Sequence, residues 1–163
     1  MSEDIVEPVE FELPELEPEG DLIIVGRIRG VLVGLPVKFV KGVDRVNQAT
    51  SLPETPGFIT GLIYFRGGIE AAVDLGVILG GDKFTRSDKS RAVLTEAEGL
   101  RGAVIFDELL DMSFITSEMV KSVEVFDIPA EPIAGRFQWR DEAGLMIAPA
   151  GLFNYIANFA NIG

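Results

Sequence analysis

Apolar residues in this chain come in short runs that are separated by glycine or by charged residues. From about residue 21 onward these runs are rich in valine, isoleucine and phenylalanine, and each has the length of a single strand. Runs of this kind, with turn residues between them at close intervals, are typical of β-strands. The pattern therefore predicts a mainly β fold.

Most of the expected strands pair into hairpins. Arg29-Gly30 and Glu98-Gly99 each lie between two apolar runs, and a further tight turn is expected at residues 66–68. Glycine in such turns supplies the positive φ that a two-residue hairpin loop requires. Strands are expected at residues 22–28, 31–35, 42–46, 59–65, 69–73, 91–96, 100–106, 113–115, 135–139 and 144–148.

Short helices are expected at three places. Pro36 can begin a helical turn that runs to about Lys41, because the first turn of a helix does not need the missing N–H. Asp74 is placed to cap a helix at residues 75–79, which Gly80-Gly81 would end. Pro149 begins a C-terminal helix to about residue 158, with three apolar residues on one face: Leu152, Phe153 and Ile156.

One segment of the first half is echoed in the second half. Residues 61–66 (Gly-Leu-Ile-Tyr-Phe-Arg) correspond to residues 135–140 (Gly-Arg-Phe-Gln-Trp-Arg), and each is followed by a turn, a strand and a helix. The offset is 74 residues before the turn and 75 after it. This order of elements predicts two similar β-units, each closed by a short helix.

The net charge of −12 is concentrated at the start of the chain. Residues 1–20 contain eight acids, three prolines and no base, which predicts an acidic, disordered leader. The alternative is a docking role for its apolar residues: Val9, Phe11, Leu13 and Leu16. The other 18 of the 26 acids are balanced against 14 bases. The folded part is thus only mildly acidic, and nucleic acid is not expected as a partner.

The residue inventory argues against catalysis and metal binding. The chain contains no cysteine and no histidine, so the usual catalytic triads, thiol nucleophiles and zinc sites have no residues to form them. No Walker or Rossmann phosphate-binding loop occurs. We therefore expect a protein that is not an enzyme and that has no cofactor and no metal.

Two aspartates leave a catalytic alternative open. Asp74 and Asp107 each follow an apolar strand and could form an acid/base pair, as in a hydrolase built on a small β-barrel. The simpler interpretation is that each carboxylate caps the turn that follows its strand.

Targeting signals are not evident. The first residues lack the basic start and apolar stretch of a signal peptide, and no apolar run reaches the ~18 residues of a membrane span. The expected localisation is cytoplasmic, without direct membrane insertion.

The most specific pattern lies in residues 33–80. Residues 52–67 read Leu-Pro-Glu-Thr-Pro-Gly-Phe-Ile-Thr-Gly-Leu-Ile-Tyr-Phe-Arg-Gly, and residues 68–75 read Gly-Ile-Glu-Ala-Ala-Val-Asp-Leu. Together they resemble the signature of the CheW family of chemotaxis coupling proteins. Residues 102–112, Gly-Ala-Val-Ile-Phe-Asp-Glu-Leu-Leu-Asp-Met, are similar to a second segment of that family. The resemblance covers about residues 21–160.

The resemblance implies a CheW-like fold in which two five-stranded, SH3-like β-barrel subdomains intertwine as a single domain over residues 21–160, with short helices and a C-terminal helix. It also implies a non-catalytic adaptor recruited to chemoreceptor arrays. Such an adaptor couples the cytoplasmic hairpins of methyl-accepting chemoreceptors to the regulatory domain of a CheA-type histidine kinase. These two proteins are the expected partners.

Site residues follow from the resemblance position by position. A receptor-binding groove between the barrels would include Arg66, Leu109 and Met112. A kinase-binding patch would include Ile24, Val37 and Val40. For Ile24 and Val37, ordinary core packing is the alternative. Two turn glycines are interpreted as structural, because they provide a positive φ or a close strand approach: Gly61 and Gly67.

The chain departs from the family pattern at several positions. Tyr64 and Phe65 replace the usual Asn and Leu, Ala71 replaces a Pro, and Pro149 replaces an Asp or Asn. The departures at Tyr64, Phe65 and Gly42 motivate an alternative: a divergent CheW-like paralogue that binds only one partner in a specialised pathway such as surface motility.

Overall fold

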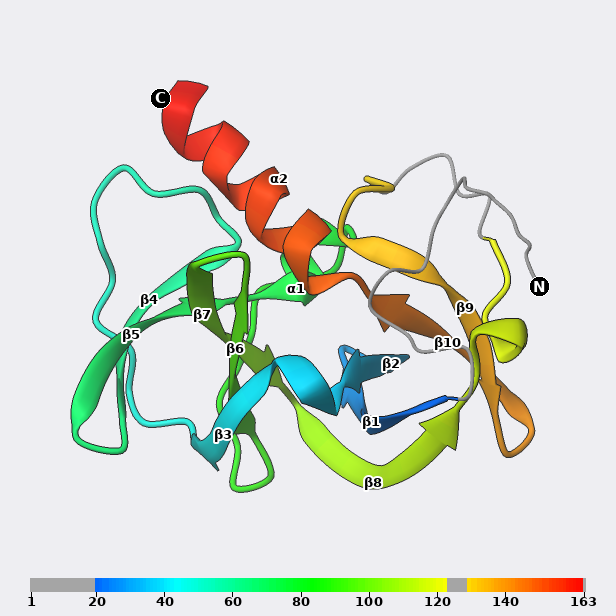
Figure 1. Cartoon of the computed structure of the whole chain (residues 1–163). Helices are drawn as coiled ribbons and strands as arrows, with labels where there is room; N and C mark the ends of the chain where they lie inside the picture. Colours follow the sequence, from blue (N-terminus) through cyan, green and yellow to red (C-terminus); the bar gives the residue numbers. More distant parts are fainter. Residues whose placement is uncertain (1–19, 123–128, 163) are drawn as a thin grey trace.

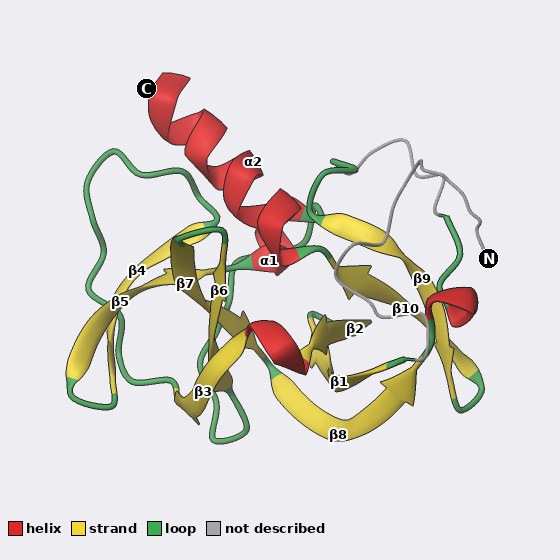
Figure 2. Cartoon of the chain, in the orientation of Figure 1, coloured by secondary structure: helices red, strands yellow, loops and turns green. Residues whose placement is uncertain are grey.

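The computed structural model describes residues 20–122 and 129–162, with side chains as far as Phe159. It is a mainly β structure with two five-stranded sheets (Figure 1), and helices are few and short apart from the last (Figure 2). The fold class expected from the sequence is confirmed. The disordered leader expected over residues 1–20 lies outside the described residues, apart from Gly20.

The chain contains ten described strands. They are β1 (Asp21–Ile28), β2 (Val31–Pro36), β3 (Val40–Arg45), β4 (Ile59–Phe65), β5 (Gly68–Val73), β6 (Arg91–Ala97), β7 (Leu100–Phe106), β8 (Glu108–Ile115), β9 (Ile133–Trp139) and β10 (Glu142–Ile147). The helical elements are the 3-10 turns η2 (Val37–Phe39) and η3 (Ser117–Met119), α1 (Leu75–Ile78) and α2 (Pro149–Ile162). No helix within these described ranges is long and apolar enough to cross a membrane.

The two sheets exchange strands. Sheet A has the order β8-β1-β2-β10-β9, and sheet B has the order β3-β6-β7-β5-β4. The chain leaves sheet A after β2, builds sheet B from β3 to β7 and returns to sheet A at β8 (Figure 1). In each sheet a central antiparallel hairpin pairs in parallel with the second strand of an outer hairpin. Sheet B is therefore built from one continuous stretch of chain, whereas sheet A combines β1 and β2 with the three strands that follow β7.

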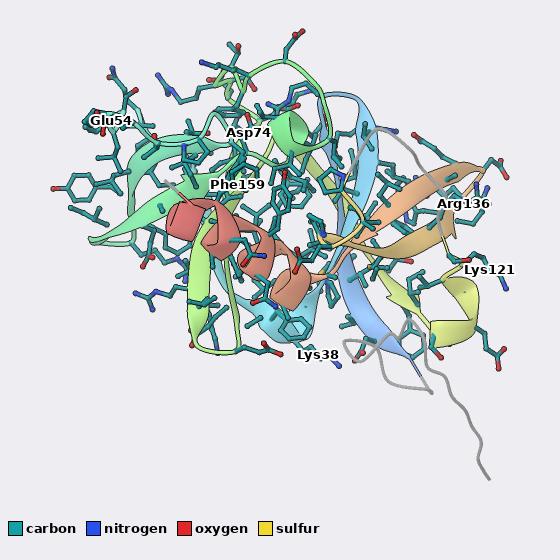
Figure 3. All side chains as sticks on the ribbon, turned by 90° about the horizontal axis from the view of Figure 1, so that it is seen from above. Lys38, Glu54, Asp74, Lys121, Arg136 and Phe159 are labelled. Atoms are coloured by element: carbon teal, nitrogen blue, oxygen red, sulfur yellow. The ribbon has the colours of Figure 1, made fainter. Side chains whose placement is uncertain are left out.

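Each sheet closes on itself by the same device. Just beyond β3, Thr50 exchanges two backbone hydrogen bonds of 2.8 and 2.9 Å with Leu62 of β4. Beyond β8, Lys121 exchanges two backbone hydrogen bonds, each of 2.7 Å, with Arg136 of β9. Figure 3 shows these two residues side by side. Because a residue beyond one edge strand bridges to the other edge, both sheets curl into barrels.

The internal echo is confirmed as two topologically equivalent units. β9, β10 and α2 begin 74 residues after β4, β5 and α1. The expected offset of 75 after the turn is therefore wrong by one residue. The second closing helix is also not short, since α2 has 14 residues.

Three apolar clusters hold the barrels together. One fills each barrel, and the third draws residues from both sheets and lies between them. In β1, Ile23 and Val25 belong to the core of barrel A, whereas Ile24 and Ile28 belong to the cluster between the barrels. The strands of the two central hairpins are thus buried on both faces, which explains their continuous apolar runs.

Local expectations are largely confirmed. Asp74 caps α1, since its carboxylate accepts from the N–H of Gly76 at 3.0 Å. Arg29, Arg66 and Glu98 have positive φ, and each is followed by a glycine of positive φ in a hairpin turn. On α2, the side chains expected on one face pack inward: Leu152, Phe153 and Ile156.

Several element boundaries differ from expectation, mostly by one or two residues, and three of the differences are larger. The helix expected from Pro36 to Lys41 is only the turn η2, because strand β3 already begins at Val40. The strand expected at residues 113–115 is the end of β8, which begins at Glu108. β8 is an edge strand with exposed polar positions, so it lacks the apolar run of a central strand. Helix α2 continues past residue 158 to Ile162.

Gly61→Ala should destabilise the fold strongly. Gly61 has φ +143, and a Cβ there would overlap the carbonyl of Thr50 at the bridge that closes barrel B. We expect a loss of about 2 kcal/mol or more in the free energy of unfolding, measured by urea denaturation. Gly68→Ala is the matched control, because its Cβ would lie 3.7 Å from the nearest atom and its φ is not positive. Equal stability of the two variants would contradict the prediction.

Candidate functional site

Arg66 occupies the turn between β4 and β5 and reaches across to the opposite edge strand of its own barrel. Its Nη2 donates to the carbonyl oxygen of Val43 at 2.9 Å, and its backbone N–H donates to Asp44 Oδ2 at 3.2 Å. Its guanidinium lies 5.8 Å from the ring centre of Phe65. Arg66 is exposed, so it supports barrel closure and still presents a positive charge to solvent.

Arg140 does the same in barrel A. It occupies the turn between β9 and β10, its Nη2 lies 3.4 Å from Asp111 of β8, and its guanidinium lies 4.4 Å from the ring centre of Trp139. The internal echo therefore extends to side-chain contacts. Sequence analysis did not single out Arg140, although the echo already aligned it with Arg66.

Leu109 and Met112 lie on β8 of barrel A. Met112 is the cross-strand partner of Ile24 in β1, and Leu109 is the partner of Gly26. In Figure 1 the β4–β5 turn lies at the outer side of sheet B, away from β8. The structure thus places Met112 beside Ile24, which the resemblance assigned to another surface. The described contacts of Arg66 are instead with β3 and Phe65.

Three large apolar side chains on β1 and β8 are exposed to solvent. Leu22, Met112 and Phe114 are 48%, 50% and 57% exposed. Leu22 and Phe114 are direct cross-strand partners, and Met112 lies two residues before Phe114. We call these three residues the β1/β8 strip. Contiguous exposed apolar surface is typical of interaction sites. Sequence analysis missed Leu22 and Phe114, because an apolar residue in a strand does not reveal whether it is covered.

The expected kinase-binding patch is only partly at the surface. Ile24 is 7% exposed and belongs to the cluster between the barrels, whereas Val37 and Val40 are partly buried against that cluster. Between them, Lys38 forms an ion pair of 3.4 Å with Asp21, which lies at the start of β1. Of the three patch residues, only Val37 and Val40 therefore offer a partner appreciable surface.

Of the two glycines expected in turns, Gly67 lies in the β4–β5 turn, whereas Gly61 lies inside β4 at a shift of register. Gly61 combines a positive φ with a close approach to Thr50, while Gly67 has φ +85 and open space around it. Gly67 is thus required by conformation alone, and Gly61 by both conformation and packing.

A buried ionic cluster joins the two barrels. Arg29, in the β1–β2 turn of sheet A, pairs through Nη2 with Asp74, and its backbone N–H donates to Asp107. Its Nη1 also lies 3.3 Å from Asp107 Oδ1. Asp74 accepts further from the N–H groups of Gly76 and Phe84, at 3.0 and 2.9 Å. Both carboxylates that could have formed a catalytic pair are therefore bound to donors of the chain itself.

The carboxylate of Asp74 is buried, whereas that of Glu142 forms an ion pair at the surface. Burial raises the pKa of Asp74, and the charge of Arg29 and nearby backbone N–H groups offset part of that rise. At the surface, Arg27 donates to both carboxylate oxygens of Glu142, at 2.5 and 2.7 Å. This hydrogen bonding lowers the pKa of Glu142 and raises the pKa of Arg27. The Arg27 pair lies within sheet A, whereas the Arg29 cluster connects the sheets.

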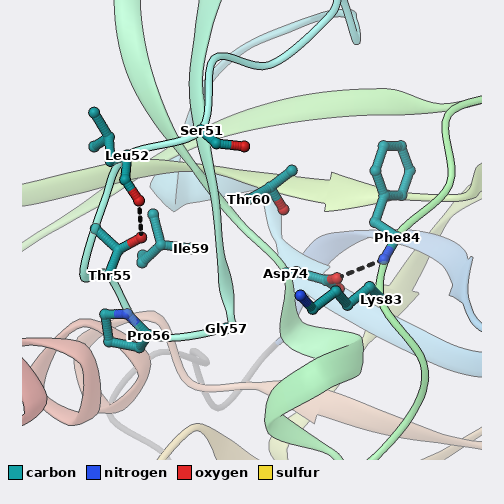
Figure 4. A pocket seen from close by; sticks show the side chains of 10 residues that line it. All are labelled: Ser51, Leu52, Thr55, Pro56, Gly57, Ile59, Thr60, Asp74, Lys83 and Phe84. Atoms are coloured by element: carbon teal, nitrogen blue, oxygen red, sulfur yellow. Dashed lines mark hydrogen bonds between the residues drawn. The ribbon is translucent and has the colours of Figure 1, made fainter.

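A hollow of about 280 Å³ lies beside this cluster (Figure 4). It is bordered by the segment of residues 51–60, by Lys83 and Phe84, and by Asp74. The hydrogen bond from the Phe84 N–H to Asp74 forms part of its wall. Because Asp74 is already bound by Arg29 and by two backbone N–H groups, its carboxylate has little capacity left to bind a ligand in the hollow.

Comparison with known proteins agrees with this architecture. The model of the CheW-like domain family matches residues 11–157. The crystal structure of the scaffolding protein TtCheW from Thermoanaerobacter tengcongensis aligns with a TM-score of 0.70 and 28% sequence identity, over 79% of this chain and 89% of that chain. No curated protein matches the sequence closely enough to count as a relative. Because the family model spans most of the chain, this protein belongs to the CheW-like family of chemotaxis scaffold proteins.

Proposed function

We propose that this chain is an adaptor that couples chemoreceptor tips to a CheA-type histidine kinase. The observation that carries the proposal is the β1/β8 strip, an exposed apolar surface on the strand by which the chain returns from one barrel to the other. Such a surface suits the apolar face of a helical hairpin. The adaptor would act in the cytoplasm, where it is recruited to receptor arrays. It would form a stable complex with its partners and catalyse no reaction.

The kinase is proposed to bind next to the receptor. Val37 is the first residue of η2 and Val40 follows its last residue. The ion pair between Lys38 and Asp21 holds η2 beside the start of β1. The next residue, Leu22, is part of the β1/β8 strip. Two partner surfaces that adjoin in this way would let one molecule hold receptor and kinase together.

A paralogue with one partner is the second candidate. Tyr64 and Ile69 are cross-strand partners on β4 and β5, and they are 63% and 61% exposed. Tyr64 is also one of the departures from the family pattern. An altered outer surface on barrel B favours a changed partner set, in a pathway such as surface motility.

Direct binding separates these candidates. The purified chain is tested by pull-down against the regulatory domain of its own organism's CheA-type kinase, and separately against a receptor cytoplasmic hairpin. Binding of both supports the adaptor, and binding of one alone supports the specialised paralogue. A folded protein that binds neither would contradict the proposed function.

Arg66→Glu is expected to weaken receptor binding about tenfold or more while the protein remains folded. Arg66 lies on barrel B, away from the β1/β8 strip, so this effect would mark a second receptor contact separate from the strip. The guanidinium is exposed at a turn, and its replacement reverses the charge presented to a partner. Affinity for the receptor hairpin would be measured by calorimetry, with thermal unfolding measured on the same sample.

Arg140→Glu is the matched control for Arg66→Glu. It reverses a charge on the equivalent turn of barrel A and likewise removes a side-chain contact to an edge strand, which is to Asp111 in barrel A and to the Val43 carbonyl in barrel B. Its receptor affinity should stay near that of the unmodified protein. If both variants lose binding equally, the effect comes from barrel closure and Arg66 has no specific role.

Met112→Lys should also reduce receptor binding about tenfold or more, because it places a charge within the β1/β8 strip. Met119→Lys is the control, since Met119 is 49% exposed but lies in η3, outside the strip. The two variants should have similar melting temperatures. Full receptor binding by a folded Met112→Lys variant would exclude the strip as the receptor surface.

Ile24→Ala should lower the stability of the fold, and any loss of kinase binding should follow from that loss of stability. Ile24 is buried between the barrels, so truncation should lower the free energy of unfolding by about 2–4 kcal/mol. Leu22→Ala, two residues earlier and 48% exposed, should change it by less than about 1 kcal/mol. Urea denaturation measures both. Lost kinase binding by a fully stable Ile24→Ala variant would instead make Ile24 a contact residue.

A further inference from the structure

Arg29 lies in the β1–β2 turn of barrel A, at its contact with two parts of barrel B: the start of α1 and the end of β7. Its side chain reaches Asp74, which caps α1 beyond β5, and Asp107, which lies between β7 and β8. The backbone N–H of Asp107 donates in turn to the carbonyl oxygen of Arg27 at 2.9 Å. One side chain and its neighbours therefore anchor the point at which the chain crosses back from sheet B to sheet A.

The surroundings leave the guanidinium little freedom. Asp74 is 1% exposed, and the Arg29 side chain is 18% exposed with a buried Nε that has no hydrogen-bond partner. A Cβ on Gly76 would overlap the guanidinium, so the first turn of α1 is shaped around it. The guanidinium also lies 5.7 Å from the ring centre of Phe84. A buried charge held in this way favours one relative arrangement of the elements that surround it.

The equivalent contact on the other side of the molecule is apolar. The β6–β7 hairpin corresponds to β1–β2, and it meets α2, where a Cβ on Gly102 would lie 3.4 Å from the Phe153 ring. Glu98 occupies the turn position of Arg29, and Ala148 precedes α2 as Asp74 precedes α1. Glu98 forms no ion pair within residues 20–122 and 129–162. Apolar contacts tolerate sliding, so the Arg29 cluster is the buried directional contact between the described parts of the barrels. The ion pair of 3.9 Å between Lys89 and Glu108 also joins the barrels, but it is exposed.

We propose that Arg29 is a positioning residue that sets the angle between the barrels and thereby the receptor surface on β8. The expected effect of Arg29 on receptor binding rests on the proposed function, whereas its expected effect on the angle between the barrels does not. Asp107 immediately precedes β8, which carries Met112 and Phe114. When Arg29 is removed, Asp74 and Asp107 lose their shared cation, and the start of β8 loses its anchor to the β1–β2 turn.

The geometry is tested by the distance between spin labels on the two barrels, measured by pulsed electron paramagnetic resonance. The chain has no cysteine, so labels can be added at chosen positions alone. Tyr64→Cys on β4 and Gln138→Cys on β9 are exposed, equivalent positions on the two barrels. Leu22→Cys with Gln138→Cys reports on barrel A alone.

Arg29→Met should broaden the distance distribution between the barrels and shift it by roughly 2 Å or more, with the pair within barrel A unchanged. Arg27→Met is the matched control, because it removes the neighbouring arginine and an ion pair that lies inside one barrel. Arg29→Lys, which can reach only one carboxylate well, should give an intermediate width.

Three outcomes separate this inference from a purely stabilising role and from the proposed function. If Arg29→Met lowers the melting temperature but leaves the distance between the barrels unchanged in the folded protein, Arg29 does not position them. A changed distance with receptor affinity lowered about tenfold supports both parts of the proposal. A changed distance in a chain whose unmodified form binds no receptor would overturn the proposed function and leave the positioning role intact.

Discussion

Two hairpins, β1–β2 and β6–β7, are apolar on both faces, and this constraint accounts for most of the architecture. A single barrel can bury only its inner face. The outer face of each hairpin is covered by the other barrel, and the cluster between them contains Ile24 and Leu35 from one hairpin and Val93 and Phe106 from the other. Burial of apolar surface is the main favourable term in folding, so each barrel depends on the other for a large share of its stability.

The order of the strands along the chain also makes the two barrels depend on each other, because each central hairpin is followed directly by an edge strand of the other sheet. β3 leaves the first hairpin to become an edge of sheet B, and β8 leaves the second to become an edge of sheet A. Within this apolar junction the Arg29 cluster is the directional element. Apolar contacts fix how much surface is buried, whereas a guanidinium between two carboxylates fixes an orientation, because its donors point in defined directions. Both are useful in a scaffold, whose output is the relative placement of the proteins it holds.

The two barrels share the same arrangement of strands and closing contacts, but they differ in the side chains on their outer surfaces. Each closes through a bridge at its edge and through an arginine in the outer hairpin turn, Arg66 or Arg140. The equivalent exposed positions differ, however, since barrel B presents Tyr64 where barrel A presents Gln138. The frame is held by backbone pairing and burial, which tolerate changes at exposed positions. Partner choice can therefore change on one barrel without disturbing the other.

The strands, their turns and the cap on α1 were predictable from the sequence, because apolar runs, glycine pairs and Asp74 act through neighbouring residues. The family signature at residues 52–75 was equally local. The sequence did not reveal which barrel each strand joins, the full length of β8, or the exposure of Leu22 and Phe114. Nor did it indicate that Arg29 would pair with Asp74 and Asp107, which lie 45 and 78 residues away. Those features were decided by the tertiary structure, because whether an apolar side chain is covered and which charges meet depend on segments that are distant in the chain.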